Sequence, residues 1–216
     1  TGGRFAGKIR VSSYSPSPNV FSGIVAAVGR IAHLQALEKG LRLTVEAPGL
    51  DLSDVALGDS IAHGGVCLTV IEKAGPAYKV DVSRETLDCT VGLDAPGEVN
   101  LEKAPRLADR LGGHLVTGHV DGVGEVLKFE RIGESHELVI RAPKPLAKYV
   151  ARKGSITVSG VSLTVNRVDK TDFSINLIPH TVAVTTLKHL QAGSKVNLEI
   201  DLVARYIERM LSAENE

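Results

Sequence analysis

Apolar and polar residues alternate in short stretches along most of the chain, which is typical of β-strands with one buried face. Residues 41–47 and 78–82 alternate in this way, and residues 21–31 are rich in Val and Ile and interrupted by glycines. Residues 97–102 predict the last short strand of this half. Short strands separated by turn residues predict an antiparallel barrel or sandwich, and closure into a barrel removes the strand edges.

Two stretches depart from the strand pattern. Residues 104–111 (APRLADRL) predict a short helix that ends at Gly112 and Gly113. Residues 201–211 (DLVARYIERML) carry apolar residues at helical spacing, which gives a helix with one apolar stripe. Such a stripe packs either on the chain's own barrel or on another copy of the chain, and the sequence favours neither.

The strand pattern is duplicated. Residues 60–70 (SIAHGGVCLTV) and 155–165 (SITVSGVSLTV) lie 95 residues apart and agree at seven positions. The motif VNLE also occurs twice, at an offset of 97. This period is too long for a solenoid. We therefore expect an N-terminal barrel at 20–115, a C-terminal barrel at 116–200, and a helix with a tail at 201–216.

Residues 1–19 are rich in Gly, Ser and Pro and contain basic but no acidic residues. They lack the long apolar core of a secretory signal. We interpret them as a disordered leader or tag outside the fold, with a transit peptide as the alternative.

Composition narrows the class of protein. The 216 residues are 43% apolar and 23% charged, which is ordinary for a globular protein, and there is no membrane-spanning apolar run. The 25 basic residues equal the 25 acidic ones, and aromatics are scarce, which argues against a nucleic-acid or membrane partner. Two cysteines form no disulfide framework and predict reduced thiols in a cytoplasmic protein.

The duplicated stretch contains Cys67 in one copy and Ser162 in the other. A lone cysteine in an apolar strand is usually a small core residue. The repeat changes this interpretation, because Thr69 and Thr164 follow two residues later and therefore lie on the same strand face. We expect each copy to form an inward-facing pocket, whose pair of short polar groups suits a flat polar heterocycle.

Histidines provide further candidates. His119 lies in residues 113–122 (GHLVTGHVDG), where the spacing of His and Asp matches no recurrent metal site. A role as general acid or base, or as a ligand-orienting donor, is the better prediction. We interpret His114 and His63 as partly exposed loop histidines. Residues 81–86 and 176–181 leave strands as polar turns, which either bind ligand at a barrel mouth or are ordinary turns.

Several of these motifs occur together in the order found in the trimeric riboflavin synthase family, which the chain resembles from about Val20 to Leu211. They are VFSGIV, the GVCLTV and GVSLTV pair, GHLVTGHVDG, LIPHT and VNLEID. The resemblance implies two six-stranded antiparallel Greek-key barrels and a homotrimer held by the C-terminal helix. It implies a transferase without metal or other cofactor, which moves a four-carbon unit between two molecules of 6,7-dimethyl-8-ribityllumazine to give riboflavin and 5-amino-6-ribitylaminouracil. The active sites would lie between barrels of neighbouring subunits, and lumazine synthase is a further implied partner.

The resemblance also assigns roles to residues. It implies catalytic roles for Cys67, His119, Ser60, Ser162 and Thr164, and leaves open whether Cys67 adds covalently. In the N-terminal pocket it places Gly23, Ile24, Val25, Ser60, Cys67, Leu68, Thr69, Asp81, Val82, Ser83, Arg84, Glu85, Thr86, Gly118, His119 and Val120. In the C-terminal pocket it places Lys153, Ser162, Leu163, Thr164, Ile178, Pro179, His180, Thr181, Val182 and Ala183.

Two departures from the family pattern stand out. Ser159 occupies a position where Asp is usual, which questions a carboxylate role in the C-terminal barrel, and Gly64 stands where Asn is frequent. The alternatives to an enzyme are an antenna-type protein that binds lumazine or flavin without turnover and a β-barrel interaction module. The thiol and the matched polar strand faces disfavour the module, and the presence of Cys67, His119, Ser162 and Thr164 favours the enzyme.

Overall fold

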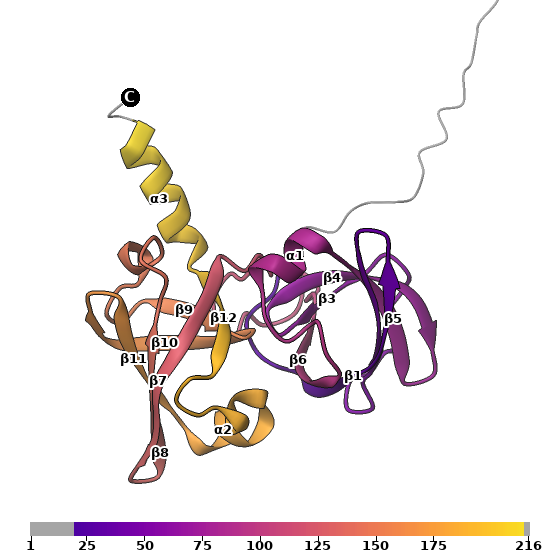
Figure 1. Ribbon diagram of the computed structural model, residues 1–216, viewed down its shortest axis with the longest axis horizontal. Coiled ribbons are helices and arrows are strands. Elements are labelled where there is room, and N and C mark those ends of the chain that lie inside the picture. Colours follow the sequence, from indigo (N-terminus) through magenta and orange to yellow (C-terminus); the bar gives the residue numbers. More distant parts are fainter. Residues whose placement is uncertain (1–19, 214–216) are drawn as a thin grey trace, which may run out of the picture.

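In the computed structural model, which describes residues 20–213, the chain forms two closed β-barrels side by side (Figure 1). The N-terminal barrel consists of β1 (Ala27–Leu37), β2 (Gly40–Glu46), β3 (Ser60–His63), β4 (Val66–Ala74), β5 (Ala77–Ser83) and β6 (Gly97–Lys103). The C-terminal barrel consists of β7 (Gly122–Ile132), β8 (Ser135–Arg141), β9 (Ser155–Val158), β10 (Val161–Asp169), β11 (Asp172–Leu177) and β12 (Lys195–Ile200). The helices are α1 (Arg84–Cys89), η1 (Ala147–Tyr149), α2 (Pro179–Val184), η2 (Thr186–His189) and α3 (Leu202–Ala213). The predicted leader at 1–19 lies outside the described residues.

The two barrels have the same topology. Their strand orders are β1-β2-β5-β4-β3-β6 and β7-β8-β11-β10-β9-β12, and every pairing is antiparallel. A bulge interrupts β4 beside β5, and an equivalent bulge interrupts β10 beside β11. The prediction of two similar six-stranded antiparallel barrels followed by a helix is confirmed.

Each barrel has its own apolar core. Leu43 and Val45 of β2 are fully buried inside the first barrel, and Leu138 and Ile140 of β8 are fully buried at the matching positions of the second. The alternation of side chains along a strand directs these residues inward and their charged neighbours outward. The alternating pattern read from the sequence therefore accounts for both cores.

One pair of core residues differs in character between the barrels. His63 of β3 is fully buried, with Nδ1 3.0 Å from the carbonyl oxygen of Ile61 and Nε2 2.7 Å from the hydroxyl of Tyr78. Burial lowers the pKa of His63 to about 4, so the imidazole is neutral at pH 7. The second barrel has Val158 and Phe173 at these positions, both buried. The expectation that His63 is a partly exposed loop histidine is wrong, because β3 continues to this residue and turns its side chain inward.

The barrels meet through two hairpin turns at residues 64–65 and 159–160. All four turn residues have positive φ, as a two-residue hairpin of type I′ requires. A Cβ on Gly65 would lie 2.9 Å from the backbone nitrogen of Gly160, so the two turns pack backbone against backbone. The amide of Asn100 donates to the carbonyl of Ser159 at 2.9 Å, and the amide of Asn197 donates to the carbonyl of Gly64 at 3.0 Å. Ser159, which the sequence analysis singled out, thus belongs to the barrel interface.

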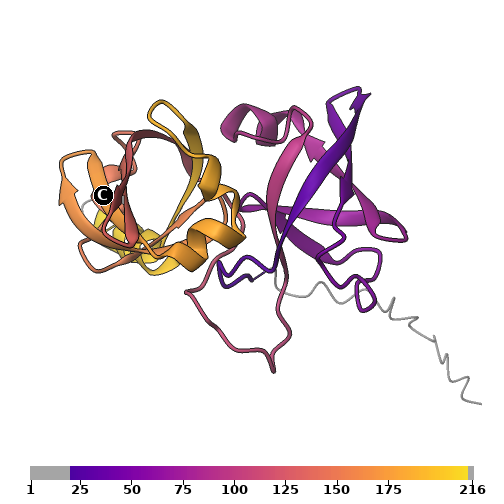
Figure 2. The ribbon, with the colours of Figure 1, turned by 90° about the horizontal axis from the view of Figure 1, so that it is seen from below.

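The segment between the barrels is not the helix that residues 104–111 predict. Residues 104–121 connect the barrels without a helix, and Figure 2 shows this connection bowing away from them. Leu107 and Leu111 are exposed, so the segment has no apolar partner to stabilise a helix. Conversely, the six-residue helices α1 and α2 were not expected.

Helix α3 follows the prediction for residues 201–211 closely and extends away from the C-terminal barrel (Figure 1). Its base is fixed by ion pairs of Arg205 with Asp121 and of Glu208 with Lys148. Its apolar stripe is more than half exposed in the single chain: Val203, Tyr206, Ile207, Met210 and Leu211. Packing of the stripe on its own barrel is therefore excluded in this structure. None of the helices in the described part of the chain could span a membrane.

Candidate functional site

Cys67 and Ser162 occupy equivalent positions on the outer faces of β4 and β10. In β4, Val66, Leu68 and Val70 are buried in the barrel core, whereas Cys67 is only partly buried and Thr69 is exposed. Ser162 and Thr164 stand in the same way on β10. The expectation of inward-facing pockets is wrong, because period-2 alternation sends the polar pair to the face opposite the apolar residues. The polar pairs did fall on one face, as predicted.

The strand edge beside each polar pair is open. The β4–β5 ladder stops at Val70↔Val80, although β4 begins at residue 66. The β10–β11 ladder stops at the equivalent pair, Val165↔Ile175. Among the described residues, the first residues of β4 therefore pair only with β3, and the first residues of β10 pair only with β9. Backbone N–H and C=O groups on the open side are suited to the edge of a planar heterocycle.

A glycine from a crossing segment closes part of each open edge. The N–H of Cys67 donates to the carbonyl of Gly118 at 2.9 Å, and the N–H of Ser162 donates to the carbonyl of Gly23 at 2.7 Å. Both glycines have φ +74°, and a Cβ on either would lie 2.6 Å from the Cβ of the facing residue. Only glycine allows this approach.

The crossing corrects one part of the predicted site. Gly23, Ile24 and Val25 were expected in the Cys67 pocket, but Gly23 bonds Ser162 and Val25 packs against the core of the C-terminal barrel. Val120, as expected, packs against the core of the N-terminal barrel. The start of each repeat thus lies against the open strand edge of the other barrel, and each open edge with its crossing segment is called here the Cys67 pocket or the Ser162 pocket.

Cys67 is a thiol on the open edge of β4, and the segment that contacts it also carries a histidine. Burial raises the pKa of the Cys67 thiol, a hydrogen bond with Ser60 lowers it, and the negative charge of Glu199 raises it further. Cys67 is therefore a protonated thiol at neutral pH. His119 is exposed and directly follows Gly118, which bonds the Cys67 backbone, so the chain places His119 next to the segment that contacts Cys67.

The Ser162 pocket also contains an imidazole, which the sequence did not predict. His114 Nδ1 lies 2.7 Å from the Ser162 hydroxyl, and Nε2 lies 3.4 Å from the hydroxyl of Thr157. Burial lowers the pKa of His114, which keeps its ring neutral. The sequence did contain one sign of this close approach, the Gly-Gly pair before His114. A Cβ on Gly113 would lie 2.7 Å from the Cβ of Ser162. Among residues 20–213 no three His, Cys, Asp or Glu side chains group as metal ligands.

The predicted polar turns adjoin the open edges. Asp81 forms a two-bond ion pair with Arg42 at 2.8 and 2.9 Å, and Ser83 caps α1 by accepting the N–H of Thr86 at 3.1 Å. The remaining residues predicted to bind ligand here lie at the strand end or in α1, and at the start of or within α2: Val82, Arg84, Glu85, Ile178, Pro179, His180, Thr181, Val182 and Ala183. Because β5 and β11 continue past the last ladder pair, α1 and α2 begin beside the open edges.

Three other predicted residues have more limited roles. The side chains of Leu68 and Leu163 pack with the barrel cores, and both residues pair with the neighbouring strand, β3 or β9, so they support the open edges rather than face a ligand. Lys153 is exposed, and its N–H donates to the carbonyl of Val165 at 2.7 Å, just before β9 begins.

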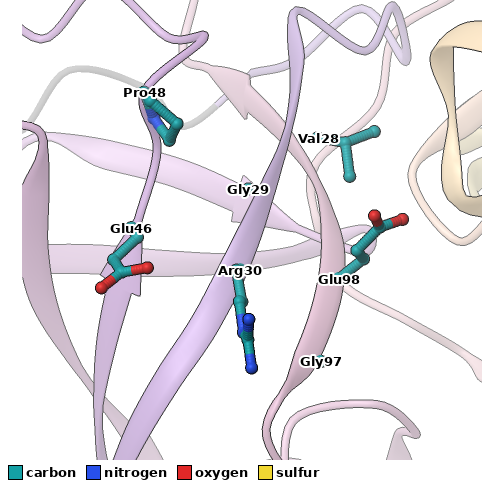
Figure 3. A pocket seen from close by; sticks show the side chains of 7 residues that line it. All are labelled: Val28, Gly29, Arg30, Glu46, Pro48, Gly97 and Glu98. Carbon is teal, nitrogen blue, oxygen red and sulfur yellow. The ribbon is translucent and has the colours of Figure 1, made fainter.

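A separate cleft of about 450 Å³ lies on the N-terminal barrel, lined by Val28, Gly29, Arg30, Glu46, Pro48, Gly97 and Glu98. Figure 3 shows Glu46 and Glu98 on opposite sides of Arg30. None of the residues predicted from the repeat lines this cleft, and it contains no thiol or imidazole. The duplicated pockets therefore remain the better candidate site.

Comparison with known proteins agrees with the duplicated site. The lumazine binding domain family matches the chain twice, over residues 22–104 and 117–201. Riboflavin synthase of Photobacterium phosphoreum is 45% identical over 194 residues, which is 89% of each chain. Riboflavin synthase of Mycobacterium bovis is 44% identical over 200 residues, covering 89% of this chain and 98% of that one. Among solved structures, LumP complexed with riboflavin superposes with a TM-score of 0.74 at 28% identity, covering 82% of this chain and 97% of that one.

Proposed function

The chain belongs to the riboflavin synthase family of lumazine-binding proteins, and we propose that it catalyses the dismutation of 6,7-dimethyl-8-ribityllumazine. One substrate molecule gives a four-carbon unit to a second, which yields riboflavin and 5-amino-6-ribitylaminouracil. The observation that carries the proposal is the pair of equivalent pockets with unequal polar groups. A reaction between two copies of one substrate needs two similar binding sites with different chemical tasks.

The two pockets divide the chemistry through their side chains. One lumazine must lose a proton from its 7-methyl group, and the other must be attacked at an electrophilic ring carbon. Cys67 and His119 act on one lumazine molecule, while Ser162 and His114 act on the other. An imidazole side chain is suited to move that proton. Holding the two rings face to face would supply a large share of the rate by orientation.

The remaining predicted contacts belong to the same proposal. Ser60 supports the Cys67 thiol, and Thr69 and Thr164 present hydroxyls beside the open strand edges. The residues around α1 and α2 are proposed to bind the ribityl chains, because each group follows the strand that flanks an open edge.

Assembly into a homotrimer forms part of the proposal. The exposed apolar stripe of α3 supports self-association, since such a stripe is stabilised when a second apolar surface covers it. Ile24, which follows Gly23 at the Ser162 pocket, and Leu115 are also exposed. We place the Cys67 pocket of one subunit opposite the Ser162 pocket of a neighbour. Two free thiols suit a cytoplasmic location, and association with lumazine synthase rests on the family resemblance.

The direct test is to incubate the protein with 6,7-dimethyl-8-ribityllumazine alone and follow the absorbance of riboflavin. Product formation without added reagents is expected. Tight binding without product would show a lumazine-binding protein that does not turn over.

Two variants test the assigned residues. Cys67→Ala and His119→Ala are each expected to lower turnover by about tenfold or more, with circular dichroism unchanged. Cys89→Ala is the matched control, because Cys89 is an exposed thiol at the end of α1. Wild-type rates in both test variants would refute their catalytic assignment.

A further inference from the structure

Each barrel ends in a strand that carries a buried glutamate. Glu102 of β6 is 7% exposed and Glu199 of β12 is 3% exposed. Neither forms an ion pair among the described residues, and burial raises the pKa of both despite their hydrogen bonds. Burying a carboxylate without a paired cation costs folding free energy, so its presence in both repeats indicates a specific role.

Both carboxylates bind a crossing segment with the same geometry. Glu199 accepts the N–H and hydroxyl of Thr117 at 2.7 and 2.8 Å, and the N–H of Gly118 at 3.0 Å. Glu102 accepts the N–H and hydroxyl of Ser22 at 2.7 Å each, and the N–H of Gly23 at 2.9 Å. Three hydrogen bonds to a charged acceptor fix a short backbone segment strongly.

These bonds act across the barrel boundary. The glutamate of the C-terminal barrel holds Gly118, whose carbonyl accepts the N–H of Cys67 on the N-terminal barrel. The glutamate of the N-terminal barrel holds Gly23, whose carbonyl accepts the N–H of Ser162 on the C-terminal barrel. We propose that Glu102 and Glu199 are positioning residues, each holding the segment that completes the pocket of the other barrel.

The Glu199 side of this arrangement has two additional features. Beyond His119, Asp121 accepts the N–H of Ile200 at 2.9 Å and pairs with Arg205 of α3. His119 is therefore presented by a short segment fixed at both ends. The charge of Glu199 also reaches the thiol of Cys67, whereas Glu102 does not contribute there. Glu199 therefore positions the reactive pocket and acts on its thiol electrostatically.

The first experiment does not require turnover. In a Cys89→Ala background, alkylation of Cys67 by iodoacetamide is compared between Glu199→Gln and Glu102→Gln at one pH. Glutamine keeps the shape, removes the charge, and replaces one accepting oxygen with an NH2 group that cannot accept a hydrogen bond. Glu199→Gln is expected to speed alkylation of Cys67 about twofold or more, through a lower thiol pKa and a looser segment. Glu102→Gln is expected to leave that rate unchanged, and equal rates in the two variants would overturn the proposal.

The second experiment uses riboflavin as a protecting ligand, and rests on the proposed function. Riboflavin is expected to protect Cys67 from alkylation in the Glu102→Gln variant but at least about tenfold less well in Glu199→Gln. Equal protection in both would contradict the cross-barrel assignment. Absence of protection in the wild type would instead contradict the proposed ligand pocket. The alkylation rates without riboflavin would still test the positioning role of the two glutamates.

Milder variants cover the case in which Glu199→Gln does not fold. Thr117→Val removes only the hydroxyl donor to Glu199, and Ser22→Ala removes the matching donor to Glu102. Thr117→Val should change alkylation of Cys67 and raise KM or lower kcat, whereas Ser22→Ala should leave the alkylation rate unchanged. A uniform loss of thermal stability with no change at Cys67 would show a structural role only.

Discussion

The buried pair of His63 and Tyr78 allows a quantitative test, because the second barrel supplies the apolar version of the same site. The Nδ1–H of His63 donates to the carbonyl of Ile61, so Nε2 accepts the hydroxyl hydrogen of Tyr78. Tyr78→Phe would leave Nε2 buried without a partner. That change is expected to destabilise the N-terminal barrel by about 1–3 kcal/mol at pH 7.

Replacing both partners should have a smaller effect than replacing one. The double variant His63→Val/Tyr78→Phe reproduces the pair Val158 and Phe173 and leaves no unsatisfied polar atom. Its stability at pH 7 is expected within about 1 kcal/mol of the wild type, because apolar pairs of similar shape substitute well for a hydrogen-bonded pair.

The same pair predicts a pH dependence with a definite sign. The pKa of His63 is about 4 in the folded barrel against 6.5 in the unfolded chain, so the unfolded chain binds the proton more tightly. The neutral ring contributes its full stability above pH 6.5, and this is lost as the pH falls towards 4. The gap between the two pKa values corresponds to about 3 kcal/mol at pH 4. The double variant should lack this loss.

Hydrogen exchange separates the two barrels in one sample. The free energy of opening is measured at amides of β5 and, as an internal reference, at amides of β11, at pH 7 and pH 4. A cost below about 0.5 kcal/mol for Tyr78→Phe, or a wild-type pH dependence in the double variant, would refute the reasoning.

Three further predictions concern the site and the terminal helix. Gly118→Ala should abolish most turnover, whereas Gly75→Ala, also at positive φ but with open space around it, should cost only about 1 kcal/mol of stability and keep turnover; equal effects measured by assay and thermal melting would contradict this. Iodoacetamide should modify the exposed Cys89 before Cys67, whose thiol pKa is raised, as peptide mass spectrometry would show; faster reaction of Cys67 would reverse the electrostatic assignment. A chain truncated after Asp201 should sediment as a monomer, and an intact trimer would exclude α3 as the element of assembly.

Much of the fold could be predicted from the sequence because its information is local and repeated. Alternation at residues 41–47 and 78–82 identified strands, and the 95-residue offset identified two copies of one barrel. The prediction of a helix at residues 104–111 is wrong because the composition suits a helix but no apolar surface covers it. The short helices α1 and α2 escaped because six residues are too few to show a helical period.

The site was predictable only in part, for a spatial reason. The repeat matched Cys67 with Ser162, and alternation put each on a face with its Thr. The direction of that face follows from the apolar neighbours Leu68 and Val70, which the sequence also contained. The sequence could not predict that Gly23 contacts the C-terminal barrel and Gly118 the N-terminal barrel. Periodicity carries no information about which barrel a segment contacts. His114 had no partner in the repeat to draw attention to it.

The interface between the barrels is two-fold symmetric in its contacts, yet it lies within a single chain. In a dimer of identical halves, any substitution appears at both symmetric positions at once. Fusion of the two halves removes that constraint, so one copy can change while the other does not. The close backbone approach of Gly65 to Gly160 leaves no room for such divergence, whereas the equivalent positions on the outer faces differ, with Cys67 in one copy and Ser162 in the other. Two copies in one chain can therefore keep symmetric contacts between the barrels and still carry different side chains at Cys67 and Ser162.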